Sequence, residues 1–240
     1  MNILITSGGT FEKIDNVRGI ANSSTGRLGC AIAQAFARLP GVSQIFYICG
    51  KTAQRPEAGK AVLYEVEGVD SLQQTITGIL ANNRIDVIIH AMAVSDYKVA
   101  AVSCPERLDN PRNLPEAVKA ADIRDGGKIS SSHEHLILLL QQSPKIIKQL
   151  RRLAPSAVLV GFKLLSGAGE QELVEVAHKL LKDRDCNFVL ANDTTQISAS
   201  AHVGYLVDRD GKYKKFDTKD EIADGIVQAV LEGGKEQWTQ

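Results

Sequence analysis

The chain has 240 residues, of which 44% are hydrophobic and 23% charged, a composition typical of a globular protein. Its 28 Lys and Arg residues balance its 28 Asp and Glu residues, which excludes a general attraction to nucleic acid or to an acidic membrane surface. The first residues show no secretory leader, and no apolar run approaches the roughly 20 residues that cross a bilayer. We therefore expect a cytoplasmic protein that binds neither nucleic acid nor membranes, and that holds any anion in a local pocket.

Short apolar runs rich in β-branched residues alternate with segments of helical periodicity. Such runs are typical of strands buried on both faces of a sheet, and they occupy residues 3–6, 44–49, 61–66, 85–91, 157–162 and 187–191. The helical segments are residues 26–39, 71–82, 144–153 and 170–182. This alternation indicates βαβ units, so we predict one α/β domain over residues 1–240, with a Rossmann-like, doubly wound, mostly parallel sheet and helices on both faces.

Two segments depart from the alternation. Residues 97–127 are rich in Pro, Arg, Asn and Asp and are too long for a compact connection, which predicts an insertion, a flap or a subunit contact. Residues 203–216 contain two short strand patterns around an Asp-Gly step, which predicts a β-hairpin near the C-terminus. A last helix is expected at residues 219–231, and the tail after Gly233 is expected to fray.

The cysteines and histidines give no metal-binding pattern. Four cysteines are scattered without a C-x-x-C pair, which argues against both a zinc site and a disulfide framework. His133 and His135 are spaced to face the same way on a strand, but no third ligand type is spaced to join them. We therefore assign no side chain as a direct metal ligand.

A phosphate cradle is predicted between the first strand and the first helix. Glycines allow a backbone to approach a ligand, while Ser and Thr before a helix leave N–H groups directed at an anion. The residues that combine these properties are Ser7, Gly8, Gly9, Thr10, Ser23, Ser24 and Gly26. A tight turn after the strand is the alternative explanation of the Gly-Gly-Thr sequence.

The connection between that strand and that helix is unusually long. A dinucleotide fingerprint passes from strand to helix within a few residues, whereas this chain inserts residues 11–21. The detour brings Arg18, whose guanidinium suits phosphate or carboxylate, and leads to Asn22, whose amide can both donate to an acyl oxygen and accept from an amine. A solvated arginine and a helix-capping asparagine are the alternatives.

Further candidate site residues lie after later predicted strands. His90, Met92, Ala93 and Asp96 lie where the fourth strand ends, and small residues followed by a carboxylate suit a nucleotide or acyl group there. A helix cap or a salt bridge is the alternative for Asp96. Lys128 follows two glycines and can neutralise a polyphosphate from a loop, although a surface lysine is the commoner case.

Five motifs occur in an order that resembles the phosphopantothenoylcysteine synthetases, and together they span nearly the whole chain. They are residues 5–10 (ITSGGT), 15–26 (DNVRGIANSSTG), 93–97 (AVSDY), 160–162 (VGF) and 191–193 (AND). The resemblance implies a ligase of coenzyme A biosynthesis that joins 4'-phosphopantothenate to L-cysteine through an acyl-nucleotidylate. It further implies Mg²⁺ with CTP or ATP as co-substrate, a homodimer, and a phosphopantothenoylcysteine decarboxylase on a separate chain that acts next.

The resemblance also implies roles for individual residues. Asn22 matches a catalytic asparagine that holds the activated acyl group, with Arg18 beside it, and Lys128 matches a loop lysine that assists nucleotidylate formation. The residues expected to contact nucleotide or acyl group are Met92, Ala93, Asp96, Phe162, Lys179 and Lys182. The chain departs from the bacterial pattern after Lys128, where Ser130 and Ser131 replace two lysines.

An NAD(P)-dependent short-chain reductase, or a nucleotide-sensing regulator with the same fold, is the alternative function. Tyr47 and Lys51 satisfy Y-x-x-x-K, but they lie at the end of a predicted strand and not on a helix. The second strand also lacks the acidic residue that would bind an adenosine ribose.

Overall fold

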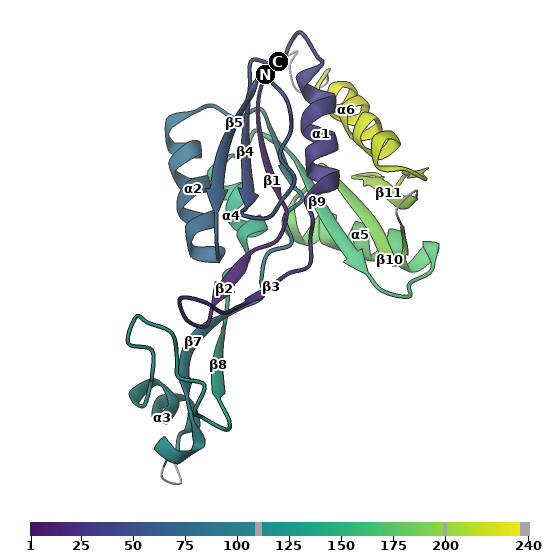
Figure 1. Cartoon of the computed structure of the whole chain (residues 1–240). Coiled ribbons are helices and arrows are strands. Elements are labelled where there is room, and N and C mark those ends of the chain that lie inside the picture. The colour runs from purple at the N-terminus through teal and green to yellow at the C-terminus, as the bar shows by residue number, and fades with distance from the viewer. Residues whose placement is uncertain (109–111, 199–200, 236–240) are drawn as a thin grey trace.

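An eight-stranded sheet forms the centre of the computed structural model, which describes residues 1–108, 112–198 and 201–235 (Figure 1). Its strand order is β12-β11-β10-β9-β6-β1-β4-β5. The six strands from β5 to β10 are parallel, and β11 and β12 complete one edge as an antiparallel hairpin. The bounds are β1 Asn2–Ser7, β4 Gln44–Gly50, β5 Ala61–Val66, β6 Val87–His90, β9 Val158–Leu165, β10 Phe188–Ile197, β11 His202–Asp208 and β12 Tyr213–Phe216. The predicted α/β fold and the C-terminal hairpin are confirmed.

Helices cover both faces of this sheet. Helices α1 (Arg27–Ala37) and α6 (Lys219–Lys235) lie side by side on one face, and α2 (Val69–Asn82), α4 (Ile146–Leu153) and α5 (Glu170–Arg184) cover the other (Figure 1). Successive side chains of a strand point to opposite faces, so each parallel strand feeds two apolar layers. The predicted tail after Gly233 is helical as far as Lys235, and residues 236–240 lie outside the described residues.

One predicted strand is less buried than its sequence suggested. Residues 61–66 form β5, but Val62 and Leu63 are 41% and 44% exposed. The prediction of burial on both faces was wrong here because β5 is the last strand of the sheet and pairs only with β4. An apolar run therefore does not distinguish a central strand from an edge strand.

Two antiparallel ribbons extend from the edge of the sheet where the parallel strands end (Figure 1). The first lies within the detour after β1 and consists of β2 (Phe11–Lys13) and β3 (Gly19–Ala21). The second pairs β7 (Tyr97–Ser103) with β8 (Ile137–Gln142), and carries the 3-10 turn η1 (Pro105–Arg107) and helix α3 (Leu114–Ala120). We call residues 97–142 the arm.

The structure of the arm differs from two expectations drawn from the sequence. The insertion was predicted to end at residue 127, but its second strand is β8, an apolar run that the sequence analysis did not assign. His133 and His135 lie in irregular backbone before β8 and not on a strand. The sequence spacing gave no third ligand for this pair, whereas the pairing of β7 with β8 brings Cys104 and Glu106 beside His133.

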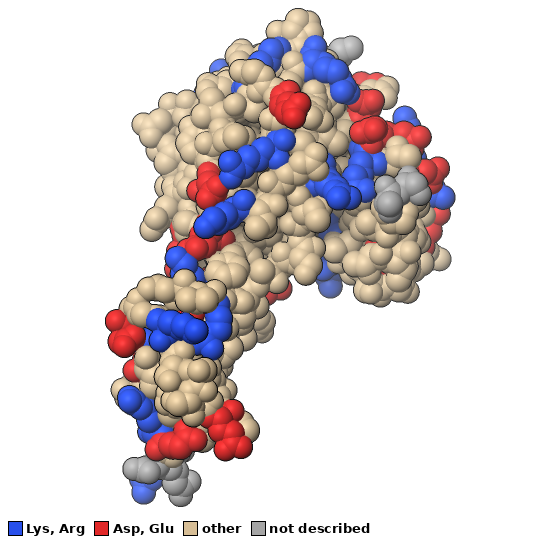
Figure 2. Space-filling view, viewed as in Figure 1, with Lys and Arg blue, Asp and Glu red and all other residues tan. Residues whose placement is uncertain are grey.

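Charged residues of both signs are mixed on the visible surface, as expected from equal numbers of basic and acidic residues. Lys, Arg, Asp and Glu side chains are interspersed over the face seen in Figure 2, without a large area of one sign. Within the described parts of the chain, none of the helices is long and apolar enough to cross a membrane.

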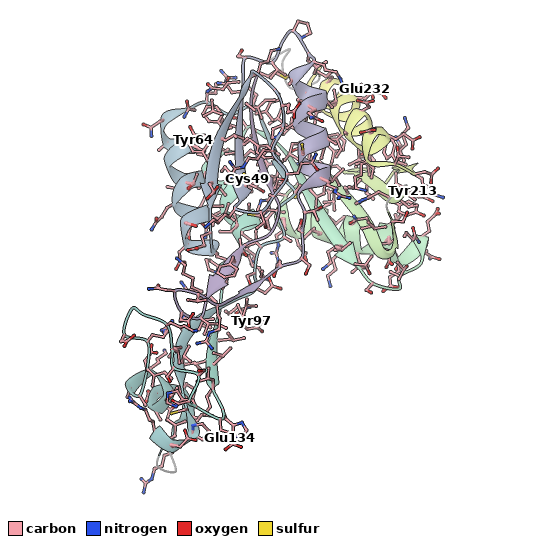
Figure 3. The ribbon with its side chains drawn as sticks, viewed as in Figure 1. Cys49, Tyr64, Tyr97, Glu134, Tyr213 and Glu232 are labelled. Atoms are coloured by element: carbon pink, nitrogen blue, oxygen red, sulfur yellow. The ribbon has the colours of Figure 1, made fainter. Side chains whose placement is uncertain are left out.

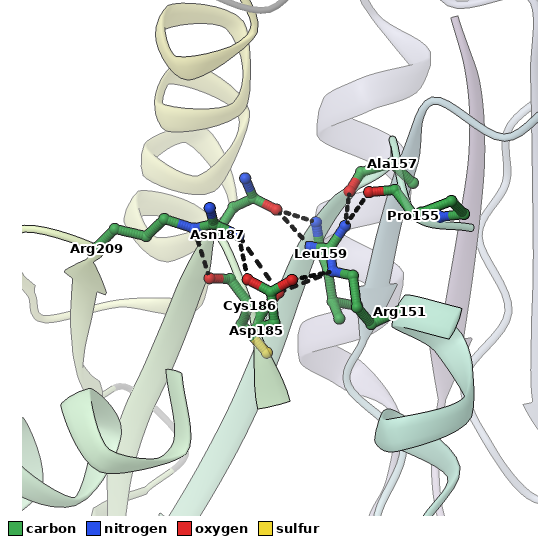
Figure 4. A network of polar contacts seen from close by, with 8 residues as sticks. All are labelled: Arg151, Pro155, Ala157, Leu159, Asp185, Cys186, Asn187 and Arg209. Carbon is green, nitrogen blue, oxygen red and sulfur yellow. Dashed lines mark hydrogen bonds and ion pairs between the residues drawn. The ribbon is translucent and has the colours of Figure 1, made fainter. Parts of the chain in front are cut away.

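A half-buried arginine fastens the opposite end of the sheet, where the parallel strands begin (Figure 4). Arg151, near the end of α4, donates to the carbonyls of Pro155, Ala157 and Asp185 at 2.8, 2.9 and 2.8 Å. It also donates to the side-chain oxygen of Asn187 at 2.8 Å. A planar guanidinium presents donors in several fixed directions, so one side chain holds three chain segments together.

We expect Arg151→Lys to lower the free energy of unfolding by about 1–3 kcal/mol, because an ammonium group cannot reproduce this divergent set of hydrogen bonds. Urea denaturation measures the change. Arg152→Lys is the matched control, because Arg152 is the next residue and is exposed. Equal midpoints for the two variants would contradict the role given to Arg151.

Candidate functional site

The segments that follow β1 and β6 run side by side at the carboxyl edge of the sheet. The Ala93 N–H donates to the Gly8 carbonyl at 2.8 Å, and the Thr10 N–H donates to the Ala93 carbonyl at 3.1 Å. Gly9 and Ala93 form a parallel bridge. The Thr10 hydroxyl also accepts from the Ser95 N–H at 2.9 Å. The two loops are therefore fixed to each other by backbone contacts.

Asn22 joins this pair of loops at the end of the detour. Its side-chain amide donates to the Ala93 carbonyl at 3.1 Å, and its backbone N–H donates to the Thr10 carbonyl at 3.2 Å. The detour thus returns to the strand ends before α1 begins. The helix-capping alternative for Asn22 is excluded, because the N-cap of α1 is Gly26.

Close approach at this point requires a glycine. A Cβ atom on Gly9 would lie 2.3 Å from the Asn22 carbonyl oxygen, far inside van der Waals contact. Any side chain at this position would push Asn22 away from the end of β1. The Gly-Gly-Thr sequence therefore forms a tight turn and also sets the position of the asparagine.

The start of α1 presents backbone N–H groups that no side chain caps. Gly26 has a φ of 72°, and its carbonyl accepts from the Ser7 hydroxyl at 3.0 Å, which fixes the helix start against β1. No side chain caps the helix, and its first turn contains no acidic residue. The unpaired N–H groups and the helix dipole together favour negative charge there.

A polar hollow of about 390 Å³ lies beside this helix start. Its lining includes two cations from different helices, Arg27 of α1 and Lys219 of α6, and one carboxylate, Asp220, so the cations outnumber the acidic group. A larger hollow of about 710 Å³ lies against β12 and the end of α6. We favour the smaller one for anion binding because it adjoins the uncapped helix start.

His90 ends β6 as a neutral, buried residue. Its Nδ1 lies 2.8 Å from the Thr6 hydroxyl, and only 8% of the residue is exposed. Burial lowers the pKa of His90 to about 4. The imidazole is therefore uncharged near neutral pH and contributes hydrogen bonding, not positive charge, to the strand ends.

A second group of polar side chains lies next to Phe162 on the neighbouring strands. Phe162 is half-buried in β9 and packs toward the α1 and α6 side of the sheet. In β10, the Asn192 amide nitrogen lies 2.8 Å from Nε2 of His202, which begins β11. Among the described residues, Nδ1 of His202 has no partner, and burial lowers its pKa to about 4. The sequence analysis missed His202, because a single histidine before a strand carries no recognisable pattern.

Asp193 organises the loop that follows β9. Its carboxylate accepts from the Ala168 N–H at 2.8 Å, from the Thr195 N–H at 2.8 Å and from the Thr195 hydroxyl. The Thr195 hydroxyl, followed by the backbone donors, lowers the pKa of Asp193 to about 2. The aspartate of the AND motif thus holds a loop in place, while its neighbour Asn192 contacts His202.

Arg18 lies at the far end of the β2–β3 ribbon and not beside Asn22. Its guanidinium pairs with the Asp15 carboxylate and donates to the Ile129 carbonyl at 2.9 Å. The Ile129 N–H donates to Asp15 at 3.1 Å, so the ribbon holds the loop that carries Lys128. The Arg18 side chain, with the backbone donors, keeps the pKa of Asp15 well below its usual range. The structure therefore groups Arg18 with Lys128.

The remaining candidates separate into two groups. Met92 is buried against the core, and Asp96 is exposed and forms a salt bridge with Lys145 at 2.5 Å. Lys179 and Lys182 are exposed on the last turns of α5, near the start of β10. The structure does not bring these two lysines to the carboxyl edge.

The tyrosine of the alternative reductase motif cannot reach a substrate. Tyr47 is fully buried in β4, and its hydroxyl donates to the Gln54 carbonyl at 2.9 Å. Burial raises the pKa of this phenol far above its ordinary value. A short-chain reductase needs an accessible tyrosine, so the geometry argues against that function.

Comparison with known proteins decides the family. The model of the DNA/pantothenate metabolism flavoprotein C-terminal domain matches residues 1–108 and 118–233. The chain belongs to this family. The resemblance to phosphopantothenoylcysteine synthetases drawn from the five motifs is confirmed.

Several known proteins are similar to this chain over most of its length. A coenzyme A biosynthesis bifunctional protein CoaBC from Thermococcus kodakarensis is 32% identical over 95% of this chain and 50% of its own length. The chain spans about half the length of the curated relatives it matches. The DNA/pantothenate metabolism flavoprotein from Streptococcus pneumoniae is 35% identical with a TM-score of 0.86, over 97% of this chain and 99% of that one. The C-terminal domain of a CoaBC protein is 25% identical with a TM-score of 0.71, over 98% and 96%.

We expect the stability of the protein to fall as the pH is lowered from about 6.5 towards 4. In the unfolded chain His90 has a pKa of about 6.5, and in the folded chain the pKa is lowered to about 4. The unfolded state binds more protons between these values, so acidification favours unfolding. His90 alone should lower the free energy of unfolding by about 2 kcal/mol between pH 7 and pH 5.

His90→Gln should remove this part of the pH dependence, as measured by urea denaturation at both pH values. His202 is present in both proteins, so its similar contribution cancels in the difference. His178→Gln is the control, because His178 is a half-buried histidine on α5. The same pH dependence in His90→Gln and wild type would contradict the neutral state assigned to His90.

Proposed function

We propose that this chain is a phosphopantothenate–cysteine ligase of coenzyme A biosynthesis, which activates 4'-phosphopantothenate with CTP or ATP and then transfers the acyl group to L-cysteine. The observation that carries the proposal is the junction of Asn22 with Ala93 and Thr10 at the strand ends. It places a fixed amide next to an uncapped helix start. Family membership and the coenzyme A biosynthesis names of the relatives support the same function.

The nucleotide phosphates would bind at the start of α1. The free N–H groups of its first turn, the Ser23 and Ser24 loop and the polar hollow lined by Arg27 and Lys219 supply donors and positive charge. The half-buried Phe162 ring, with Asn192 on the next strand, offers an apolar surface and an amide for the base. These groups do not distinguish a cytosine from an adenine.

In the first step the pantothenate carboxylate attacks the α-phosphorus, forming an acyl phosphate bond as the bond to pyrophosphate breaks. Negative charge accumulates on the phosphoryl oxygens, and cations placed beforehand lower the barrier. Lys128 is exposed on the loop that Asp15 and Arg18 hold against the β2–β3 ribbon. We assign to Lys128 the stabilisation of this charge, which requires its loop to bring the ammonium group from the tip of the ribbon to the strand ends.

In the second step the cysteine amine attacks the acyl carbon, and the nucleoside monophosphate leaves. The Asn22 amide nitrogen carries two hydrogens, and one is directed at the Ala93 carbonyl. This contact fixes the plane of the amide. The second hydrogen and the amide oxygen remain to bind the developing oxyanion and the incoming amine.

Magnesium would reach the site together with the nucleotide. Mg²⁺ prefers oxygen ligands and is commonly held by one or two carboxylates with substrate phosphates. The exposed Asp96 carboxylate fits this requirement, because Lys145 pairs with one oxygen and leaves the other accessible. When bound, the ion would neutralise charge on the phosphoryl oxygens.

A homodimer is part of the same proposal. Four large apolar side chains are more than 40% exposed on the ribbon and the arm: Val17 at 65%, Tyr97 at 54%, Leu114 at 51% and Leu140 at 43%. Contiguous apolar surface marks interaction sites, and we propose that the ribbon and the arm form the contact between the two subunits. Analytical ultracentrifugation that gave the mass of one chain would contradict the dimer.

The activity is tested by pyrophosphate release. With 4'-phosphopantothenate and Mg²⁺, we expect CTP or ATP to release pyrophosphate in the absence of cysteine, and the peptide-like product to appear only after cysteine is added. Parallel assays with the two nucleotides decide which one is used. No release with either nucleotide would overturn the proposed function.

Asn22→Ala should fold normally and yet form product at least about 100-fold more slowly, comparable to loss of one oxyanion donor. Thermal denaturation checks folding, and a chromatographic assay measures product. Asn82→Ala is the control, because Asn82 is an exposed residue at the end of α2. Wild-type turnover by Asn22→Ala would remove this side chain from the mechanism while leaving the activity itself intact.

Lys128→Gln should slow pyrophosphate release at least about tenfold without affecting the stability of the sheet. Asp15→Asn should slow the same step, since the carboxylate holds both Arg18 and the Ile129 N–H. Lys119→Gln is the control, because Lys119 is exposed on α3 of the same arm. Unchanged release by Lys128→Gln would return Lys128 to the class of surface lysines.

A further inference from the structure

Three side chains with metal-binding chemistry meet in the arm, away from the strand ends. The Cys104 sulfur, a Glu106 carboxylate oxygen and a His133 ring nitrogen all lie within 4.8 Å of one another. They belong to the outer part of the arm, where Figure 3 labels the neighbouring Glu134. Among the described residues, this is the group of three His, Cys, Asp or Glu side chains that is close enough to hold one ion.

Chain pairing explains why these residues meet. Cys104 directly follows β7 and precedes the 3-10 turn that contains Glu106, whereas His133 lies in the backbone that leads into β8. The antiparallel pairing of Ser103 with Ile137 places the segment after β7 and the segment before β8 at the same end of the ribbon. The cluster therefore joins residues from both strands of the arm.

The environment of the cluster combines burial with access. Cys104 is only 2% exposed, His133 is half-buried and Glu106 is exposed. The sulfur thus forms the inner wall, and the carboxylate lies at the solvent side where an ion can enter. Burial raises the pKa of the Cys104 thiol, which also donates to the Glu106 carboxylate.

The donor set identifies the kind of ion. Thiolate and imidazole ligands select Zn²⁺ and similar transition metals, whereas Mg²⁺ and Ca²⁺ prefer oxygen ligands throughout. We propose that Cys104, Glu106 and His133 bind one Zn²⁺ ion, with water in the fourth tetrahedral position. Binding converts the thiol to a thiolate, and its proton is released to solvent.

The ion would act as a clamp on the arm. A two-stranded ribbon is marginally stable in water, and in its described residues the arm adds to it the 3-10 turn η1 and the short helix α3. An ion shared between the end of β7 and the approach to β8 links the two strands at their outer end. This role is independent of the ligase activity proposed above, and its test does not require that activity.

Cobalt and zinc titrations of the full chain test the site. Co²⁺ should give the visible bands of a tetrahedral site and a near-ultraviolet sulfur-to-metal charge-transfer band, both abolished by one equivalent of Zn²⁺. Loss of an outer-shell partner alone costs about 10–100-fold in metal affinity. Cys104→Ser and His133→Gln should therefore weaken Zn²⁺ binding at least about tenfold in competition with a chromophoric chelator.

Two controls make the result decisive. His178→Gln keeps all three ligands and should bind like wild type, and every variant retains the three cysteines outside the site, Cys30, Cys49 and Cys186. Trypsin should cut the wild-type arm at Arg107 more slowly with Zn²⁺ than with a chelator, a difference that Cys104→Ser should lose. A missing charge-transfer band in the wild-type protein, or equal Zn²⁺ affinity of wild type and both ligand variants, would overturn the proposal.

Discussion

The backbone of Ala93 is the contact on which the candidate site depends. Its N–H and carbonyl bond to the Gly8 and Thr10 backbone, and the same carbonyl accepts from the Asn22 side chain. Strands β1 and β6 are neighbours in the sheet, so their carboxyl ends meet at one edge. Ala93 converts that proximity into a fixed geometry, because two loops and the Asn22 amide all bond to the backbone of this one residue. The absence of a Cβ on Gly9 makes this approach sterically possible.

The detour after β1 connects two chemically different places. At its base, Asn22 is held against the strand ends, and at its tip Asp15 and Arg18 bind the backbone of Ile129. A helix directly after the strand, as in a dinucleotide-binding fold, would provide neither contact. The ribbon formed by β2 and β3 therefore gives the loop of Lys128 a defined position relative to the sheet. An insertion far along the chain is in this way tied to the first loop.

Strands and helices with a periodic hydrophobic pattern were predicted from the sequence. Contacts between residues far apart in the chain were not. Buried parallel strands and amphipathic helices carry local signals, and the C-terminal hairpin carries an Asp-Gly turn, so these elements were identified. Strand β8 is an apolar run that was left unassigned, and its pairing with β7 at the start of the insertion carries no local signal. The glycine loop and Asn22 were recognisable from motifs. The contact of Arg18 with Ile129, the pairing of Asn192 with His202 and the meeting of Cys104 with His133 arise only when the chain folds.

The hydrogen bonds that fasten the sheet lie where its parallel strands begin, and the candidate site lies where those strands end. At the edge where the parallel strands begin, Arg151 and Arg209 satisfy the carbonyls around Asp185 and Cys186 (Figure 4). At the other edge, the start of α1 is left uncapped and Nδ1 of His202 lacks a partner among the described residues. Unsatisfied polar groups cost free energy in a folded protein unless a ligand binds them. The separation lets the sheet tolerate such groups where the substrate phosphates would bind, because its other end is held by fully bonded side chains.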